Sequence, residues 1–221
     1  MTINLSLTEE NYLKAIFHLS QDVEEVVSTN AIADHLDTKP ASVSDMIRKL
    51  SNKSLIDYEK YQGVTISDTG RKLALQIVRK HRLWEVFLVD HLKFNWDEVH
   101  EVAEQLEHIQ SPLLIKRLDE FLGFPKQDPH GDPIPDEHGI INEKPQALLL
   151  EVPVQSTGLV VTVKDTGKAF LQYLDKIGLQ IGTKIRVLEK VEYDQSMEIL
   201  IDGKKQVYIS KQVAENLLIS E

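Results

Sequence analysis

The stretch Asp37–Leu55, DTKPASVSDMIRKLSNKSL, decides the fold of the first part of the chain. A proline stands near its start, and its apolar residues recur at the spacing of an amphipathic helix. These apolar residues are Val43, Met46, Ile47 and Leu50. A shorter helical pattern with a Ser/Thr cap, Ser28–Leu36, lies just before it. Two short helices joined by a tight turn predict a helix-turn-helix.

The segments on either side extend this motif. Thr8–Leu19 opens with a threonine N-cap signal and carries an apolar stripe at helical spacing, which predicts a first helix. After the motif, Ile56–Tyr61 and Val64–Ser67 alternate in polarity about the turn Gln62-Gly63, which predicts a β-hairpin. Three helices followed by a hairpin predict a winged helix-turn-helix domain over residues 1–70.

The charges of this first domain are segregated. Residues 1–70 contain six Lys/Arg against eleven Asp/Glu, yet five of the six cations fall between Lys39 and Lys60, on the predicted recognition helix and wing. A helix with small hydroxyl residues at its start and cations at its far end suits base edges and phosphates. The expected DNA contacts are Thr29, Lys39, Pro40, Ala41, Ser42, Ser44, Asp45, Arg48, Lys49, Lys53 and Lys60. The alternative is a solvated basic helix in a winged helix that binds another protein.

Composition restricts the function classes. The formal charge of −10 argues against a general polyanion binder, so DNA binding has to come from the local basic face. The chain has no cysteine, so any metal must be held by nitrogen and oxygen atoms. It carries no secretion signal and no apolar run of the ~18–20 residues that span a membrane, which predicts a cytoplasmic protein. No catalytic triad, Walker loop or GxGxxG motif is present, so we do not expect an enzyme.

The stretch Val99–Ser111, VHEVAEQLEHIQS, is the candidate metal site. On helical spacing it places His100, Glu104, Glu107 and His108 on neighbouring positions of one face. The last three are donors of suitable type within little more than one turn, which favours a metal site. An acidic face turned to solvent is the alternative.

A long helix is predicted over Asp68–Leu92, and it carries His81 on its apolar stripe with Glu85 four residues later. Such a pair offers two metal donors, although a lone histidine on an apolar stripe is more often a core residue. The following helix, Leu113–Leu122, has an apolar surplus that suits a dimer interface. The segment Gly123–Pro145 concentrates proline, glycine and aspartate, which predicts a boundary loop.

The remainder of the chain is predicted to be mostly short strands, which together imply a small β-barrel. The predicted strands are Gly158–Val163, Lys184–Val191, Met197–Ile201 and Gln206–Ser210, with helices at Gly167–Ile177 and Lys211–Leu217. The fold class is therefore mainly α with small β parts. The predicted domains are residues 1–70, a helical domain over residues 71–145, and the barrel over residues 146–221.

In this order the motifs resemble the DtxR/MntR family of iron- and manganese-dependent transcriptional repressors, over essentially the full length. The strings that carry the resemblance are TEENYLKAI, KPASVSDMIRKL, RKHRLWEVFLVDHL, VHEVAEQLEH, SPLLIKRLDEFLGFP and DPHGDPIP. The resemblance implies an N-terminal winged helix, a helical dimerisation and metal-binding domain, and an SH3-like, FeoA-like C-terminal domain.

The resemblance also implies two metal sites in each subunit. The primary site would use Asn11, Glu104, Glu107 and His108, and the second His81, Glu85, His100, Asp128, His130 and Asp165. Glu104 points to manganese, because family members with sulfur ligands at this position respond to iron and those with Glu respond to manganese. Asn11 departs from the manganese pattern, since its amide oxygen brings no negative charge.

The function implied is that of a homodimeric repressor. Mn(II) or Fe(II) would activate it to bind palindromic operators of metal-uptake genes in double-stranded DNA. Two alternatives belong to other classes. One is a metal-independent winged-helix regulator that senses a small molecule, and the other is a metal-dependent hydrolase or oxidase.

Overall fold

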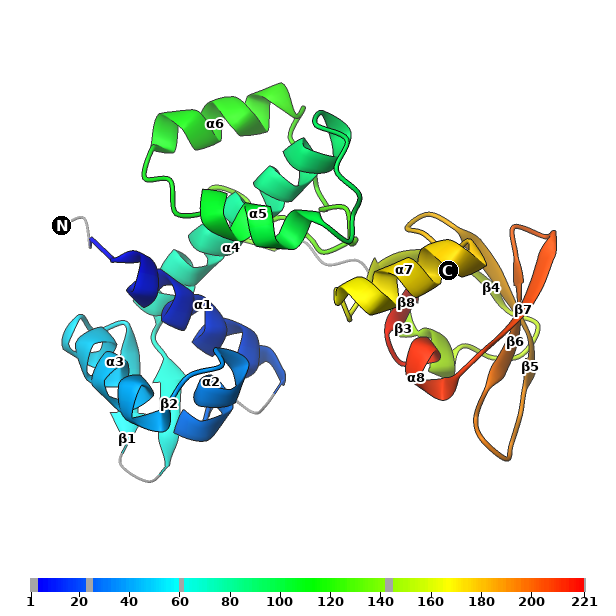
Figure 1. Cartoon of the computed structure of the whole chain (residues 1–221), viewed down its shortest axis with the longest axis horizontal. Helices are drawn as coiled ribbons and strands as arrows, with labels where there is room; N and C mark the ends of the chain where they lie inside the picture. The colour runs from blue at the N-terminus through cyan, green and yellow to red at the C-terminus, as the bar shows by residue number, and fades with distance from the viewer. Residues whose placement is uncertain (1–3, 23–25, 60–61, 142–144, 221) are drawn as a thin grey trace. The chain divides into compact units, whose positions relative to one another are not determined.

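A computed structural model describes residues 4–22, 26–59, 62–141 and 145–220 (Figure 1). The chain divides into two compact units. The first unit consists of Met1–His81, Gln105–Pro112 and Pro135–Ile140. The second consists of Arg82–Glu104, Leu113–Ile134 and Ile141–Glu221.

The first unit contains the winged helix-turn-helix that the sequence predicts. Its elements are α1 (Leu7–Asp22), α2 (Thr29–His35), α3 (Pro40–Asn52), β1 (Ile56–Glu59) and β2 (Gly63–Ile66). The Ser28 hydroxyl caps α2 by accepting a hydrogen bond from the Ala31 amide at 3.1 Å, and Pro40 occupies the first turn of α3. Strands β1 and β2 pair antiparallel. Val27 adds a bridge to Val64, with backbone hydrogen bonds of 2.8 and 2.9 Å in both directions.

The core of this unit is built from the inward faces of the three helices and the hairpin. Its largest fully buried side chains are Leu13, Ile16, Ile32, Ile47, Leu50, Leu55 and Ile56. Gly70, in the first turn of the next helix, lies directly against Leu55, in the connection between α3 and β1. A β-carbon at this position would lie 2.0 Å from the carbonyl oxygen of Leu55, so only glycine allows this approach.

Three helices follow the wing: α4 (Asp68–Asp90), α5 (Val99–Leu106) and α6 (Pro112–Phe121). The helical spacing predicted for His100 to His108 holds only as far as Leu106, where α5 ends, and residues 107–108 form a turn. The Ile109 amide donates to the Leu106 carbonyl at 3.1 Å in this turn. Pro112 starts α6. Proline disfavours helical geometry in the residue before it, so the helix cannot run without interruption from α5 into α6.

The second unit contains a six-stranded antiparallel sheet with the order β3-β8-β4-β5-β6-β7. The strands are β3 (Ala147–Leu148), β4 (Thr157–Val163), β5 (Lys184–Lys190), β6 (Met197–Ile201), β7 (Lys205–Ile209) and β8 (Leu217–Ser220). The sequence predicts β4 to β7 and misses the two shorter strands. The predicted helix over Lys211–Leu217 is wrong at its end, because α8 (Lys211–Ala214) is a single turn and β8 then pairs with both β3 and β4.

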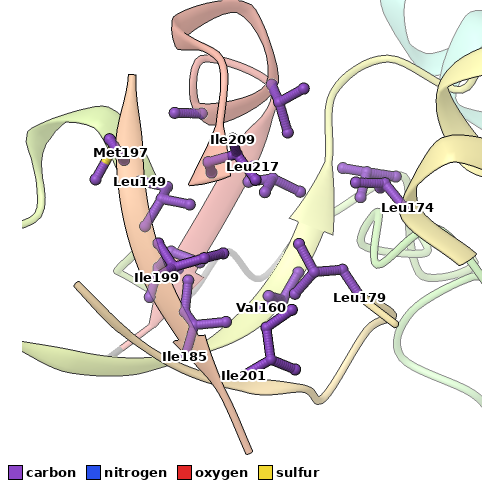
Figure 2. Packing of buried hydrophobic residues seen from close by; sticks show 14 of the residues in the cluster. Leu149, Val160, Leu174, Leu179, Ile185, Met197, Ile199, Ile201, Ile209 and Leu217 are labelled. Atoms are coloured by element: carbon purple, nitrogen blue, oxygen red, sulfur yellow. The ribbon is translucent and has the colours of Figure 1, made fainter. Parts of the chain in front are cut away.

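One continuous hydrophobic core contains buried side chains of this sheet, of α7 (Lys168–Ile177) and of the 3-10 turn η1 (Leu149–Glu151). Figure 2 shows side chains from the strands and from α7 packed together in this core, among them Leu174, Val160 and Ile199. α7 ends at Gly178, whose φ of 84° is the left-handed conformation that glycine adopts most readily at a helix end.

Within the described part of the chain, no helix is long and apolar enough to cross a membrane.

The core makes a direct prediction about stability. Leu174 has no exposed surface, and Leu174→Ala is expected to lower the free energy of unfolding by about 2–5 kcal/mol, because it removes buried methyl groups and leaves a cavity. Leu159→Ala is the matched control, since Leu159 is 45% exposed on strand β4 of the same unit. Urea unfolding followed by circular dichroism measures both; equal losses in the two variants would contradict the assignment of this core.

Candidate metal centres and DNA-binding face

The first candidate centre lies in the first unit and joins three segments. We call it the first cluster. It consists of Glu10 and Lys14 of α1, Lys80 and His81 of α4, and Glu107, His108 and Gln110 of the turn that follows α5. Glu10 and Lys14 are four residues apart, which places them one above the other on α1.

Glu107 is the most deeply buried member, with no exposed surface. Its Oε1 lies 2.6 Å from Nζ of Lys14, and its Oε2 lies 2.6 Å from Nδ1 of His81. Burial alone would raise the pKa of the Glu107 carboxyl. The hydrogen bond from His81 and the positive charge of Lys14 outweigh that effect and hold its pKa below the ordinary value. Glu107 is therefore a buried, charged carboxylate.

Glu10 forms the other half of the cluster and is 5% exposed. Its Oε2 lies 2.5 Å from Nδ1 of His108, and its Oε1 accepts a hydrogen bond from Nε2 of Gln110 at 2.7 Å. Lys80 approaches the same carboxylate at 3.8 Å. Burial lowers the pKa of Lys80, and the charges of Glu10 and Glu107 offset only part of that effect.

The structure brings two of the four residues expected in the primary site into the first cluster. Glu107 and His108 lie in the first cluster, but Asn11 is exposed on α1, and Glu10 contributes the carboxylate instead. Glu104 belongs to the second unit, where its side chain is 50% exposed and lies 3.7 Å from Nε2 of His100. Glu10 could have been found from the sequence, because it shares the buried stripe of α1 with Leu13 and Phe17, three and seven residues later.

The second candidate centre lies in the second unit and consists of Glu85, Asp128 and His130, which we call the second cluster. All three are buried, at 2%, 7% and 2% exposure, and one ligand atom from each lies within 4.8 Å of the other two. His130 Nδ1 is 3.8 Å from Oε2 of Glu85. The family resemblance places these three residues in one second site, and the fold brings them together.

The imidazole of His130 has a fixed orientation. Its Nε2 lies 2.8 Å from the carbonyl oxygen of Trp96, and the Trp96 ring stacks on it with a centroid separation of 6.0 Å. Donation from Nε2–H to this carbonyl would leave Nδ1 directed towards Glu85. A backbone carbonyl that orients a histidine in this way is a common outer partner of metal-binding imidazoles.

The charges around the second cluster are unevenly balanced. Arg82 Nε lies 3.4 Å from Asp128, and its Nη2 lies 3.3 Å from Asp132. Burial and the negative charges of Glu85 and Asp132 nevertheless raise the pKa of Asp128 to about 7. Burial would lower the pKa of His130, but its hydrogen bond to Glu85 and the charges of Glu85 and Asp128 raise it to about 9. A site that shifts its groups in these directions favours additional positive charge.

The loop that carries Asp128 and His130 is held against strand β4. The Val163 amide donates to the His130 carbonyl at 3.0 Å, and the Thr162 hydroxyl donates to the Gly131 carbonyl at 3.1 Å. A β-carbon on Gly131 would lie 1.9 Å from the carbonyl oxygen of Val161. Gly131 is thus required for this close contact.

The other residues expected in the second site are His81, His100 and Asp165, and one ligand atom each of His81, Glu85 and His100 lies within 4.8 Å of the other two. His100 Nδ1 lies 3.7 Å from Glu85 in the second unit, and its side chain is 53% exposed. His81 precedes Glu85 by one turn of α4 and bonds Glu107 in the first cluster. Asp165 is exposed and accepts a hydrogen bond from the Gly167 amide at 2.8 Å, at the start of α7.

Both clusters fit a divalent cation of the harder kind by the chemistry of their donors. Each combines buried carboxylate oxygens with imidazole nitrogens, a set that suits Mn(II), Fe(II) and related ions. Lys14, Lys80 and Arg82 were not expected from the sequence, because their ion pairs depend on how distant segments approach one another.

The predicted recognition helix presents its polar face to solvent. Val43, Met46, Ile47 and Leu50 of α3 are buried. The predicted contacts on the opposite face are exposed, namely Lys39, Pro40, Ala41, Ser42, Asp45, Arg48 and Lys49. Thr29 and Ser44 are partly buried, and Lys60 lies outside the described residues.

Lys53 differs from the other predicted contacts. Its Nζ lies 2.7 Å from Oε1 of Glu9 and donates to the carbonyl of Asn4 at 3.0 Å. It therefore ties the end of α3 to the start of α1, next to Glu10 of the first cluster.

Three family models together match nearly the whole chain. Residues 4–64 match the iron-dependent repressor N-terminal DNA-binding domain, and residues 67–136 match the iron-dependent repressor metal-binding and dimerisation domain. Residues 148–221 match the FeoA domain.

Individual relatives agree with these models. The iron-dependent repressor IdeR of Mycobacterium tuberculosis is 36% identical over 129 residues, or 58% of this chain and 55% of the relative, so the match spans about half of that protein. The regulator MntR of Oceanobacillus iheyensis is 32% identical over 54% of this chain and 80% of its own length. A solved structure of a manganese-dependent transcriptional repressor in complex with manganese is 36% identical, with a TM-score of 0.87, covering 96% of this chain and 98% of that chain. On these grounds the chain belongs to the DtxR/MntR family of iron- and manganese-dependent transcriptional repressors.

Proposed function

We propose that this protein is a transcriptional repressor that binds DNA when it has bound Mn(II) or Fe(II). The observation that carries the proposal is the first cluster, in which buried carboxylates and imidazoles join α1 of the winged helix to the turn after α5. The names of its relatives, an iron-dependent repressor and a manganese-dependent repressor, support the same function.

Manganese is the proposed ion, since the donors are oxygen and nitrogen and the chain has no cysteine. We propose Glu107, His108 and Glu10 as the centre of the first site, with Glu104 and Asn11 retained as candidates from the sequence. We propose Glu85, Asp128 and His130 as the centre of the second site. His81, His100 and Asp165 are the further candidates there.

The chain's own residues suggest how a site in the first cluster would act on DNA binding. A bound divalent cation would supply positive charge and bonds to several of these donors at once. Glu10 and its neighbour Glu9 lie in the first turns of α1, and Lys53 connects Glu9 to the end of the recognition helix α3. Holding α1 against the turn after α5 would thereby favour one orientation of α3. Regulation then requires that the ion bind this arrangement more tightly than others.

We further propose that the protein acts as a cytoplasmic homodimer on palindromic operators of metal-uptake genes, and as a regulator and not an enzyme. The two-fold symmetry of a dimer would match two half-sites about one helical turn, or a multiple of it, apart. The match to a metal-binding and dimerisation domain supports this assembly. The relatives also support a metal-dependent repressor over a small-molecule regulator or a hydrolase.

Metal dependence can be tested by replacing one histidine of the first cluster and, as a control, one histidine outside both clusters. His108→Ala is expected to weaken Mn(II) binding by at least about 10–100-fold, because it removes a donor of the first cluster and even the loss of an outer partner of a ligand costs that much. It is also expected to abolish the Mn(II)-dependent gel shift of operator DNA. His138→Ala is the control, since the side chain of His138 is 73% exposed and lies outside both clusters. Operator binding by the wild type that is equally tight in excess chelator would contradict the proposed function.

The recognition face can be tested through salt. Arg48 is 74% exposed in its side chain on α3, and Arg48→Ala is expected to weaken operator binding. Loss of one phosphate contact would also make the slope of log K against log salt concentration shallower by about one. Lys204→Ala, at an exposed turn between β6 and β7, is the control and should leave affinity and slope unchanged. An unchanged slope for Arg48→Ala in fluorescence anisotropy would remove Arg48 from the phosphate contacts.

The number of sites can be counted by calorimetry. The wild type is expected to bind two Mn(II) ions per subunit, and His130→Ala is expected to bind one, because only the second cluster loses its imidazole. His138→Ala again serves as the control. Two ions bound by His130→Ala with unchanged affinities would show that His130 is not a ligand.

A further inference from the structure

The carboxylates of the first cluster are already fully engaged by the protein itself. Both oxygens of Glu107 have partners at 2.6 Å, Nζ of Lys14 and Nδ1 of His81. Both oxygens of Glu10 are likewise engaged, by His108 at 2.5 Å and by Gln110 at 2.7 Å. A cation that binds these carboxylates therefore meets donors that are already in place on each oxygen.

Lys14 is the hydrogen-bond donor that would compete directly with a metal cation for the carboxylate of Glu107. Its ammonium group is a compact positive charge, and unlike an imidazole it has no lone pair to offer a metal while it is protonated. It lies on Oε1 of Glu107, a carboxylate with no exposed surface, and its own side chain is only 12% exposed. Two positive charges on one buried carboxylate oxygen repel strongly, because little water screens them.

Lys14 also gives the metal-free protein something that Glu107 needs. A buried carboxylate without a partner is costly, and removal of one member of a buried ion pair destabilises the fold. Lys14 supplies this partner from within the chain, across 93 positions of sequence. The same ion pair that stabilises the metal-free fold thus opposes metal binding.

We propose that Lys14 sets the metal affinity of the first cluster by acting as a tethered cation, which occupies Glu107 in the metal-free protein and leaves it when a metal binds. This inference rests on the proposed function, since it assumes that the first cluster takes a divalent cation. It assigns a role to a residue that is not itself a ligand. The role is to raise the metal concentration at which the protein responds.

The charge of Lys14 is tested with Lys14→Gln, which keeps a hydrogen-bond donor but removes the charge. Mn(II) titration of the full chain by calorimetry is expected to give a Kd about tenfold lower than that of the wild type, within the usual range of coupling between sites. The melting temperature of the chelator-treated variant should fall, and the rise in melting temperature on adding Mn(II) should grow. Lys14→Arg retains the charge and should leave the Kd close to that of the wild type. Lys204→Gln, at the exposed turn between β6 and β7, should change none of these quantities.

A second measurement uses the wild type and does not depend on the stability of a variant. Acetylation of lysines by a water-soluble reagent, read by mass spectrometry, should label Lys14 faster in the Mn(II)-loaded protein than in the chelator-treated protein. Lys204 is the internal control, because it is exposed and distant in sequence from both clusters.

The outcomes separate the two proposals. If the wild type binds Mn(II), but Lys14→Gln binds it no more tightly or Lys14 labelling does not rise with metal, the role of Lys14 is wrong and the proposed function stands. If the wild type binds no Mn(II), the proposed function itself fails.

Discussion

The charge of Glu107 has to be neutralised inside the protein, because this carboxylate has no exposed surface. The chain meets that requirement from separate segments: Lys14 of α1 lies on one oxygen and His81 of α4 on the other. One buried charge thereby connects the first helix of the winged domain, the long helix after the wing and the turn after α5. The fold of the first unit and its candidate metal chemistry depend on the same contact, so a change in what neutralises Glu107 acts on both.

Local patterns were sufficient to predict most of the fold. The apolar spacing of α1 and α3, the serine cap of α2 and the hairpin about Gly63 are properties of neighbouring residues, and the structure confirms them. The misses are elements that distant partners define. Strand β8 has four residues, and it is a strand because β3 and β4 flank it. Helix α5 ends at Leu106 because the chain has to reach Pro112 and begin α6.

The same distinction applies to the candidate sites. Residue type and spacing identified Glu107 and His108, and resemblance to a family grouped Glu85 with Asp128 and His130, which the fold brings together. The resemblance named Asn11 as the ligand from α1; Asn11 is exposed, whereas Glu10 lies 2.5 Å from His108. The countercharges Lys14, Lys80 and Arg82 could not be predicted, since an ion pair between residues far apart in sequence leaves no periodic signal. Both candidate centres are therefore best described as clusters of paired charges, and not as bare sets of ligands.

In the loop of the second cluster, His130 contacts both the cluster and strand β4. The side chain of His130 belongs to the cluster, while its carbonyl accepts the hydrogen bond of the Val163 amide in β4 at 3.0 Å. At Gly131 the loop and the strand approach so closely that a β-carbon would not fit between them. Exchange of the Val163 amide hydrogen with solvent deuterium requires that this bond open. The rate of that exchange therefore reports, from inside the β-sheet, how firmly the donor loop is held, and a change at His130 would be visible there without any probe attached to the cluster.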